Sequence, residues 1–121
     1  MAPTLLARVT DNMKVSCEEI FAPVMSIVEF DGIDEAVARA NATPFGLSVG
    51  LFTSNLHTAF RAARALRFGG VHVNEASSAR VDAMPFGGFK YGSLGREGVR
   101  FAYEEMTQPK VVCIRRSARR H

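Results

Sequence analysis

Hydrophobic and polar positions follow two different periods along this chain, and each change of period marks a new element. Residues 25–30 (MSIVEF) are mostly apolar and β-favouring, and Asp31-Gly32 ends the run, so a strand is expected there. From Ile33 to Ala40 the apolar positions recur at i, i+3, i+4 and i+7, which predicts a helix with one buried face. We expect Asp31 to cap this helix, because a side-chain oxygen there can accept hydrogen bonds from free backbone N–H groups.

The same alternation is repeated further along the chain. Residues 47–52 predict a second buried strand, and residues 56–66 return to the helical spacing, with Ser54 as the expected N-cap. Residues 71–73 then predict a third strand. The order of elements is therefore strand, helix, strand, helix, strand.

These elements define the fold class as α/β, with a small parallel βαβαβ sheet and flanking helices, because short crossovers join successive strands in parallel. Towards the C-terminus, Val99 and Met106 belong to the apolar stripe of a further helix, and residues 109–114 read as a terminal strand. We expect a single domain over residues 1–114. Residues 115–121 are expected to form a basic, disordered tail.

The basic charge of the chain is concentrated in that tail. The formal net charge is +3, but four arginines lie in the last seven residues, and without them the net charge is −1. Nucleic-acid binding requires a basic face or stripe, so the composition argues against it. No apolar run approaches the ~20 residues of a membrane-spanning helix, so no membrane contact is expected.

The cysteine content points to a reduced protein. Cys17 and Cys113 are too few for a disulfide framework or a zinc site. The N-terminus has no charged region followed by an apolar run, which argues against a secretory signal. We therefore expect a cytoplasmic protein without a metal ion.

The segment of residues 84–98, MPFGGFKYGSLGREG, contains five glycines and cannot be an ordinary helix or strand. Pro85 fixes its own φ, and Gly87-Gly88 permits backbone conformations that other residues resist. We call this stretch the glycine segment. Because it follows the third strand, we expect it at the carboxyl ends of the strands, where open parallel sheets bind their ligands.

The sequence resembles the NAD(P)-dependent aldehyde dehydrogenase superfamily, in the C-terminal part of its catalytic domain. The matching segments occur in the order that the family has them, and together they extend over nearly the whole chain. They are EEIFAPV (18–24), NATPFGLS (41–48), GVHVN (70–74) and MPFGGFK with SLGRE (84–97).

The resemblance implies two residues that contact the cofactor. Glu19 matches the glutamate that accepts hydrogen bonds from the nicotinamide ribose, and Phe21 matches the aromatic residue beside the nicotinamide ring. Without the resemblance, Glu19 reads as a solvated surface acid. Ala22 replaces the usual glycine of the family, and it would cost about 1 kcal/mol if that position requires a positive φ.

The resemblance also implies two substrate-lining residues, Phe86 and Arg80. Phe86 matches an aromatic residue of the substrate tunnel, although a phenylalanine beside Pro-Gly turns more often serves packing. Arg80 lies in the variable segment at the substrate end, where a guanidinium can bind a carboxylate or phosphonate on the aldehyde. A salt bridge with Asp82, or an exposed side chain, is an open alternative.

The family's cysteine nucleophile, its general base and its dinucleotide fold have no counterpart in these residues, and neither Cys17 nor Cys113 matches the nucleophile. The resemblance therefore implies a C-terminal portion of a dehydrogenase that oxidises an aldehyde to a carboxylic acid with NAD or NADP. We expect the chain alone to be inactive and to bind no cofactor. The alternative is a non-catalytic oligomerisation or interaction domain. Expected partners are a second copy, through residues 109–114, and an upstream catalytic segment.

Overall fold

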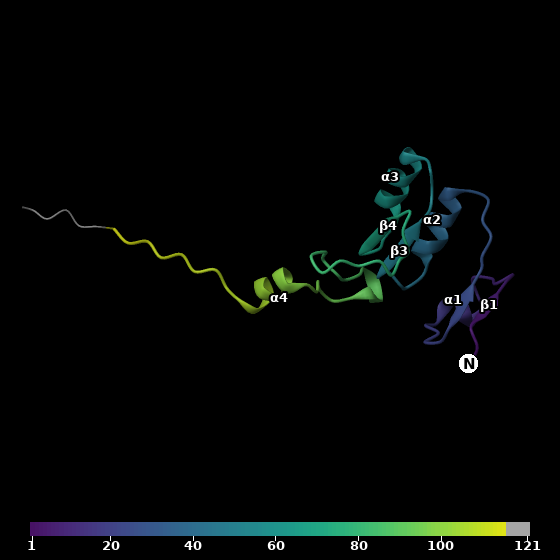
Figure 1. Cartoon of the computed structure of the whole chain (residues 1–121), viewed down its shortest axis with the longest axis horizontal. Coiled ribbons are helices and arrows are strands. Elements are labelled where there is room, and N and C mark those ends of the chain that lie inside the picture. The colour runs from purple at the N-terminus through teal and green to yellow at the C-terminus, as the bar shows by residue number, and fades with distance from the viewer. Residues whose placement is uncertain (116–121) are drawn as a thin grey trace, which may run out of the picture.

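The computed structural model describes residues 1–115, which form an α/β fold with short parallel strands and flanking helices (Figure 1). All of the expected tail except Arg115 lies outside the described residues. In chain order the elements are β1 (Thr4–Leu6), α1 (Lys14–Cys17), β2 (Val24–Ser26), α2 (Ile33–Ala42), β3 (Ser48–Leu51), α3 (Leu56–Ala65), β4 (Gly70–Val73), the 3-10 turn η1 (Lys90–Gly92) and α4 (Val99–Met106).

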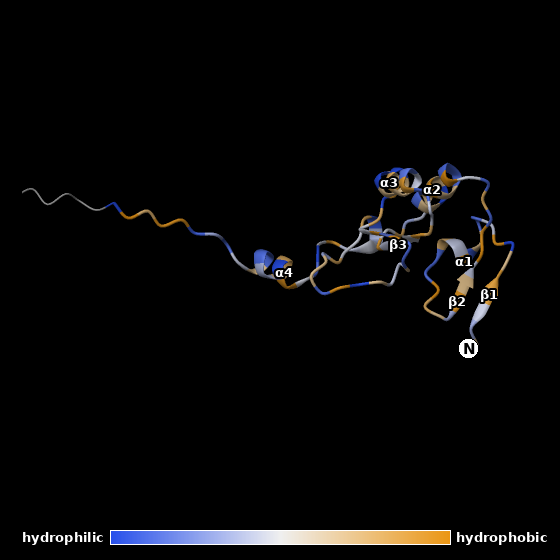
Figure 2. Cartoon of the chain, turned by 45° about the horizontal axis from the view of Figure 1, so that its top comes forward, coloured by the Kyte–Doolittle hydropathy of each residue, from blue (hydrophilic) through white to orange (hydrophobic). Residues whose placement is uncertain are grey.

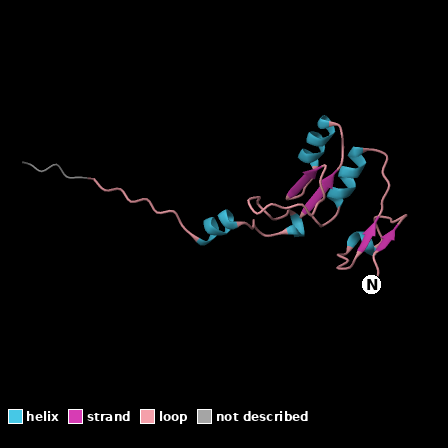
Figure 3. Ribbon diagram, in the orientation of Figure 1, coloured by secondary structure: helices cyan, strands magenta, loops and turns pink. Residues whose placement is uncertain are grey.

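The strands form two separate parallel pairs (Figure 3). β1 pairs with β2, with Thr4 opposite Val24, and β3 pairs with β4, with Ser48 opposite Gly70. The α/β class with parallel strands is confirmed, but the single βαβαβ sheet is wrong. The hydrophobic periodicity predicted the position of β2 in the sequence. It could not predict which other strand β2 would pair with. The strand is also shorter than expected, because its partner β1 ends at Leu6, which lies opposite Ser26.

Helices α2 and α3 pack against each other on the same side of the β3–β4 pair, as Figures 1 and 2 show. Ala59 and Ala62 of α3 are buried, together with Leu66 just after it and Val9 near the N-terminus. Many larger apolar side chains in the described part of the chain remain exposed. The core is therefore small, and much apolar surface is left for other contacts.

The helix caps differ from the expected residues by one position. Asn55 caps α3, since its Oδ1 accepts a hydrogen bond from the Thr58 N–H at 3.1 Å, and Ser54 does not. At α2 the N-cap is Gly32, and Asp31 provides no side-chain cap. The Asp31 N–H instead donates to the Glu35 carboxylate at 2.9 Å. Both expected caps are one residue too early, because the cap is the residue directly before the first helical one.

Arg39 links α2 to the N-terminal strand pair. Its guanidinium forms an ion pair with Asp11 at 2.8 Å and donates to the Glu29 carbonyl at 2.9 Å. The hydrogen bond to Asp11, reinforced by the charge of Glu35, raises the pKa of Arg39 above its usual value. The link joins residues that are far apart in the sequence.

After β4 the chain turns back across the β3–β4 pair. A Cβ on Gly50 would lie 2.7 Å from the carbonyl oxygen of Glu75, so the returning chain passes directly over β3. The Phe89 N–H then donates to the carbonyl of Gly46 at 3.0 Å, just before β3 begins. The glycine segment therefore lies at the amino ends of β3 and β4, and its expected place at their carboxyl ends is wrong.

Beyond α4, residues 107–115 run away from the rest of the chain (Figure 1). The expected strand at residues 109–114 is not formed within this chain, because no other strand lies beside it to share hydrogen bonds. Val111 and Ile114 are 86% and 90% exposed. Across residues 1–115, none of the helices combines the length and the hydropathy needed to cross a bilayer.

Candidate functional site

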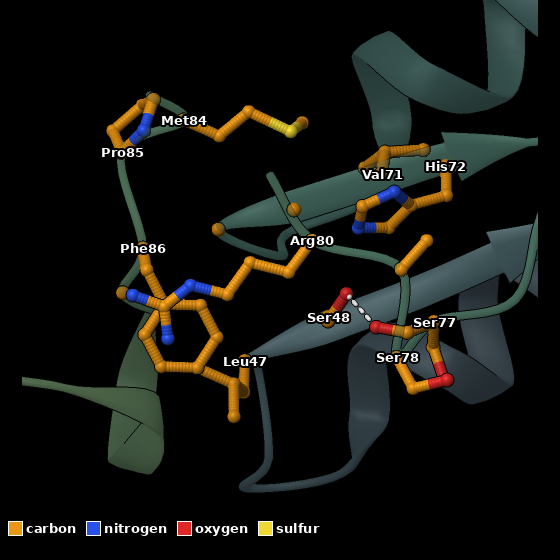
Figure 4. Close-up of a pocket in the computed structure, with 14 residues that line it drawn as sticks. Leu47, Ser48, Val71, His72, Ser77, Ser78, Arg80, Met84, Pro85 and Phe86 are labelled. Carbon is orange, nitrogen blue, oxygen red and sulfur yellow. Dashed lines mark hydrogen bonds between the residues drawn. The ribbon is translucent and has the colours of Figure 1, made fainter. Parts of the chain in front are cut away.

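Two hollows of the surface contain the residues singled out from the sequence. The first, which we call the arginine hollow, has a volume of about 470 Å³ (Figure 4). It lies between the starts of β3 and β4, the loop of residues 77–80 and the first part of the glycine segment, residues 84–87. It therefore forms where the returning chain meets the strands.

Arg80 and Phe86 meet in the arginine hollow. The guanidinium carbon of Arg80 lies 4.2 Å from the centroid of the Phe86 ring, and Figure 4 shows the side chain extended over that ring. A cation at this distance is attracted to the aromatic face. The alternative salt bridge with Asp82 is not formed within the described chain, but the other alternative is met, because the Arg80 side chain is exposed.

His72 also enters this hollow, and the sequence analysis did not single it out. Its imidazole points from β4 into the space beside Ser77 and Ser78 (Figure 4). Ser48 donates a hydrogen bond to the Ser77 carbonyl at 2.7 Å, which ties the loop to β3. Strand alternation alone could not have found His72, because Val71 and His72, which alternate along β4, both line this hollow.

The backbone around Phe86 is held on both sides. The Phe86 N–H donates to the Glu97 carbonyl at 3.0 Å, and the Glu97 N–H donates back at 2.6 Å. Arg96 donates to the Gly88 carbonyl at 3.2 Å. Lys90 donates to the Thr43 carbonyl at 2.8 Å, which ties the glycine segment to the end of α2. The ring of Phe86 thus projects from a fixed loop.

The second hollow, which we call the Glu19 hollow, lies before β2 and has a volume of about 610 Å³. Residues 18–22 line it together with Phe45 and Leu47. Phe21 is 96% exposed at its surface. Ala22 is not among the residues of positive φ in the described chain, so the strain considered for it is absent.

Leu47 lines both hollows, so they adjoin one another at the start of β3. Glu19 and Phe21 lie on one side of it, and Arg80 and Phe86 on the other. The two pairs come from distant parts of the sequence, and Leu47 contributes to the lining of both hollows. The arrangement places an exposed carboxylate and an aromatic wall next to a hollow that contains a cation.

The two cysteines lie away from these hollows. Cys17 is exposed, and its thiol donates to the Asp11 carbonyl at 3.0 Å. Cys113 is exposed in the segment beyond α4. Among residues 1–115, no group of three His, Cys, Asp or Glu side chains could hold a metal ion.

Comparison with known proteins relates this geometry to one family. A profile of the aldehyde dehydrogenase family matches residues 1–112. Aspartate-semialdehyde dehydrogenase 1 of Pseudomonas canavaninivorans is 56% identical over 111 residues, which are 92% of this chain and 24% of that protein. The 3-sulfolactaldehyde dehydrogenase of Priestia aryabhattai is 45% identical over 112 residues, 93% of this chain and 24% of that protein.

The fold agrees with solved structures as well. The crystal structure of aldehyde dehydrogenase 21 from Physcomitrella patens, in complex with the reaction product succinate, matches with a TM-score of 0.87 and 38% identity, over 93% of this chain and 24% of that one. Other similar proteins are named for betaine aldehyde or retinaldehyde, and similar structures hold NAD+ or NADP. The chain spans about a quarter of the length of the relatives described above.

Proposed function

This chain belongs to the aldehyde dehydrogenase family, and from that premise we propose that it supplies cofactor-lining and substrate-lining surfaces for the NAD(P)-dependent oxidation of an aldehyde to a carboxylic acid. The observation that carries the proposal is the meeting of the two hollows at Leu47. We use "assembled dehydrogenase" for an enzyme in which this chain is combined with the further segments that its relatives contain.

Glu19 and Phe21 suit the nicotinamide half of the cofactor. None of the hydrogen bonds or ion pairs between described residues uses the Glu19 carboxylate, so both of its oxygens are free to accept from a ribose diol. The exposed ring of Phe21 offers an apolar wall that limits the motion of a flat ring beside it. When bound, NAD(P)+ supplies the hydride acceptor, and these residues orient it.

Phe86 and Arg80 form the aldehyde side of the proposed site. The ring of Phe86 gives the arginine hollow an apolar wall, and Arg80 gives it a fixed positive charge. The names of the relatives do not select one aldehyde, since they include aspartate semialdehyde and 3-sulfolactaldehyde as well as betaine aldehyde and retinaldehyde. The class of aldehyde must therefore be inferred from the residues of this chain.

The 121-residue chain by itself is proposed to be inactive and to retain no cofactor. Neither cysteine lines the two hollows, and the Cys17 thiol donates a hydrogen bond to a backbone carbonyl, which is not a general base. A cytoplasmic location belongs to the same proposal, because both cysteines are free. The chemistry would then require the assembled dehydrogenase.

A second candidate function is that of an interaction domain, and the exposed apolar residues beyond α4 favour it. Val111, Val112 and Ile114 are 86%, 69% and 90% exposed on an extended segment. An apolar extended segment offers unpaired backbone groups to a strand of another chain. Residues 109–114 are therefore proposed to join two copies as a dimer or a larger oligomer.

One experiment separates the two functions. Glu19→Gln is introduced into the assembled dehydrogenase, and NAD(P)H formation and oligomeric mass are measured. The dehydrogenase proposal predicts weaker use of NAD(P)+ with unchanged mass. Normal cofactor use in this variant would contradict the assigned role of Glu19, and assembly without any turnover in the unsubstituted protein would favour the interaction domain.

A further inference from the structure

The guanidinium of Arg80 in the arginine hollow has no hydrogen-bond or ion-pair partner among the described residues, and this bears on which class of aldehyde the site would oxidise. We propose that the aldehyde oxidised at this site carries an oxyanion group, a carboxylate or a phosphoryl group, and that Arg80 binds it while Phe86 orients the guanidinium. This inference rests on the proposed function, because it concerns the substrate of the same site.

The hydrogen-bonding capacity of Arg80 is unused. Phe86 covers one face of its guanidinium, at 4.2 Å, but the N–H donors lie in the guanidinium plane and stay free in such a stack. Within residues 1–115, Arg80 donates no hydrogen bond and forms no ion pair. Arg39, Arg61 and Arg100 have carboxylate partners, whereas Arg64 and Arg67, like Arg80, have none among the described residues. The Phe86 ring against its guanidinium distinguishes Arg80 from these two. Arg80 is thus oriented without being neutralised.

The surroundings of Arg80 favour a negatively charged ligand. No Asp or Glu is among the described residues that line the arginine hollow. Asp82, the nearest acid in the sequence, lines a different hollow beside α4. His72 faces the same space and adds no negative charge in either protonation state. The natural complement of an unpaired guanidinium is a carboxylate or phosphoryl group, which accepts two parallel N–H donors.

Phe86 acts as a positioning residue for Arg80. Its backbone exchanges two hydrogen bonds with the backbone of Glu97, at 3.0 and 2.6 Å, so the backbone from which its ring projects is held in place. The ring therefore holds the guanidinium in place before a ligand arrives. A guanidinium that is already in place reduces the ordering that binding would otherwise require.

The test compares charged and neutral aldehydes of matched size in the assembled dehydrogenase. The kcat/KM values are measured for succinate semialdehyde against butanal, and for glyceraldehyde 3-phosphate against glyceraldehyde. The unsubstituted enzyme is expected to prefer the charged member of at least one pair, and that pair identifies the oxyanion. Arg80→Ala should reduce this preference by at least about tenfold. Arg64→Ala removes an exposed arginine of α3 as the matched control and should leave the preference unchanged.

Two variants of Phe86 test its positioning role. Phe86→Leu removes the aromatic face and should lower the preference for the charged aldehyde, whereas Phe86→Tyr keeps the face and should retain it. Equal preference in the leucine and tyrosine variants would overturn the positioning role.

The failure of this inference differs from the failure of the proposed function. Equal losses for charged and neutral aldehydes in Arg80→Ala, with turnover retained, would overturn the substrate class alone. No turnover with any aldehyde would contradict the proposed function, and NMR titration of the full chain would then decide the inference. A shift of the Arg80 Nε–H resonance with succinate, and none with neutral succinamide, supports it, and no shift with either ligand overturns it.

Discussion

The carbonyl oxygen of Gly87 occupies the space in which a side chain on Gly69 would begin. A Cβ on Gly69 would overlap that oxygen and lie 2.7 Å from the Cα of Gly88. The glycine segment therefore rests on the residue just before β4 with no room for a methyl group. This contact helps to place Phe86, and with it Arg80, at the edge of the arginine hollow.

Replacing Gly69 by alanine should disturb both stability and the site. Since the clash is with backbone atoms, we expect Gly69→Ala to cost about 1–3 kcal/mol of unfolding free energy. Gly32→Ala is the matched control, because nothing lies within 4 Å of a Cβ there. It should cost less than about 1 kcal/mol as a change at a helix cap. Denaturant unfolding of the assembled dehydrogenase measures the stability of both variants. Equal denaturant concentrations at the unfolding midpoint for the two variants would contradict the close contact at Gly69.

Glu19 should affect cofactor use more than aldehyde use. In the assembled dehydrogenase, Glu19→Gln weakens acceptance of the ribose hydroxyls, and we expect KM for NAD(P)+ to rise by about tenfold. Steady-state kinetics with each substrate varied in turn provides the measurement. Glu29→Gln, in an exposed residue outside both hollows, is the control. A rise in the KM of the aldehyde alone would contradict this role and would indicate that Glu19 contacts the aldehyde instead of the cofactor.

The purified 121-residue chain should form no NAD(P)H from an aldehyde. The Cys17 thiol donates a hydrogen bond to the Asp11 carbonyl at 3.0 Å, and Cys17 lines neither hollow. Spectrophotometric assays of the chain with several aldehydes, before and after repurification, measure the activity. Steady turnover that survives Cys17→Ser would contradict the prediction, and turnover abolished by that substitution would make Cys17 a nucleophile.

Self-association should depend on residues 109–114. Burial of Val111, Val112 and Ile114 against a second chain would remove exposed apolar surface, so we expect the full chain to be at least a dimer at tens of micromolar. Size-exclusion chromatography with light scattering compares it with a chain ending at Gln108. A monomeric full chain, or equal association of the two chains, would refute this role.

Local patterns predicted the helices and the class of the fold. The stripes beginning at Ile33 and Leu56 became α2 and α3, because apolar spacing depends only on neighbouring residues. The partner of β2 could not be predicted in this way. That strand pairs with β1, where the sequence indicated only a short extended piece around Leu5 to Val9 and no partner for it. Register and pairing are set by packing over long distances in the sequence.

The candidate site, like the fold, could be predicted from the sequence only in part. Family motifs named Glu19, Phe21 and Phe86, and Arg80 was inferred from its place in the variable segment, but no pattern in the sequence indicated that Arg80 would lie over the Phe86 ring. The position of the glycine segment was also wrong, because the returning chain crosses the strands at Gly50, and this crossing depends on close approach of two backbones. Such contacts follow from the fold and cannot be read from local spacing.

The central claim is that this chain forms cofactor-lining and substrate-lining surfaces of an aldehyde dehydrogenase, and a chimera tests it most directly. Residues 1–112 replace the matching quarter of the aspartate-semialdehyde dehydrogenase of Pseudomonas canavaninivorans, and NAD(P)H formation is measured with several aldehydes. The account predicts a folded chimera that oxidises an aldehyde and loses efficiency with NAD(P)+ on Glu19→Gln. A chimera that folds and assembles like its parent but oxidises none of the aldehydes would contradict the account.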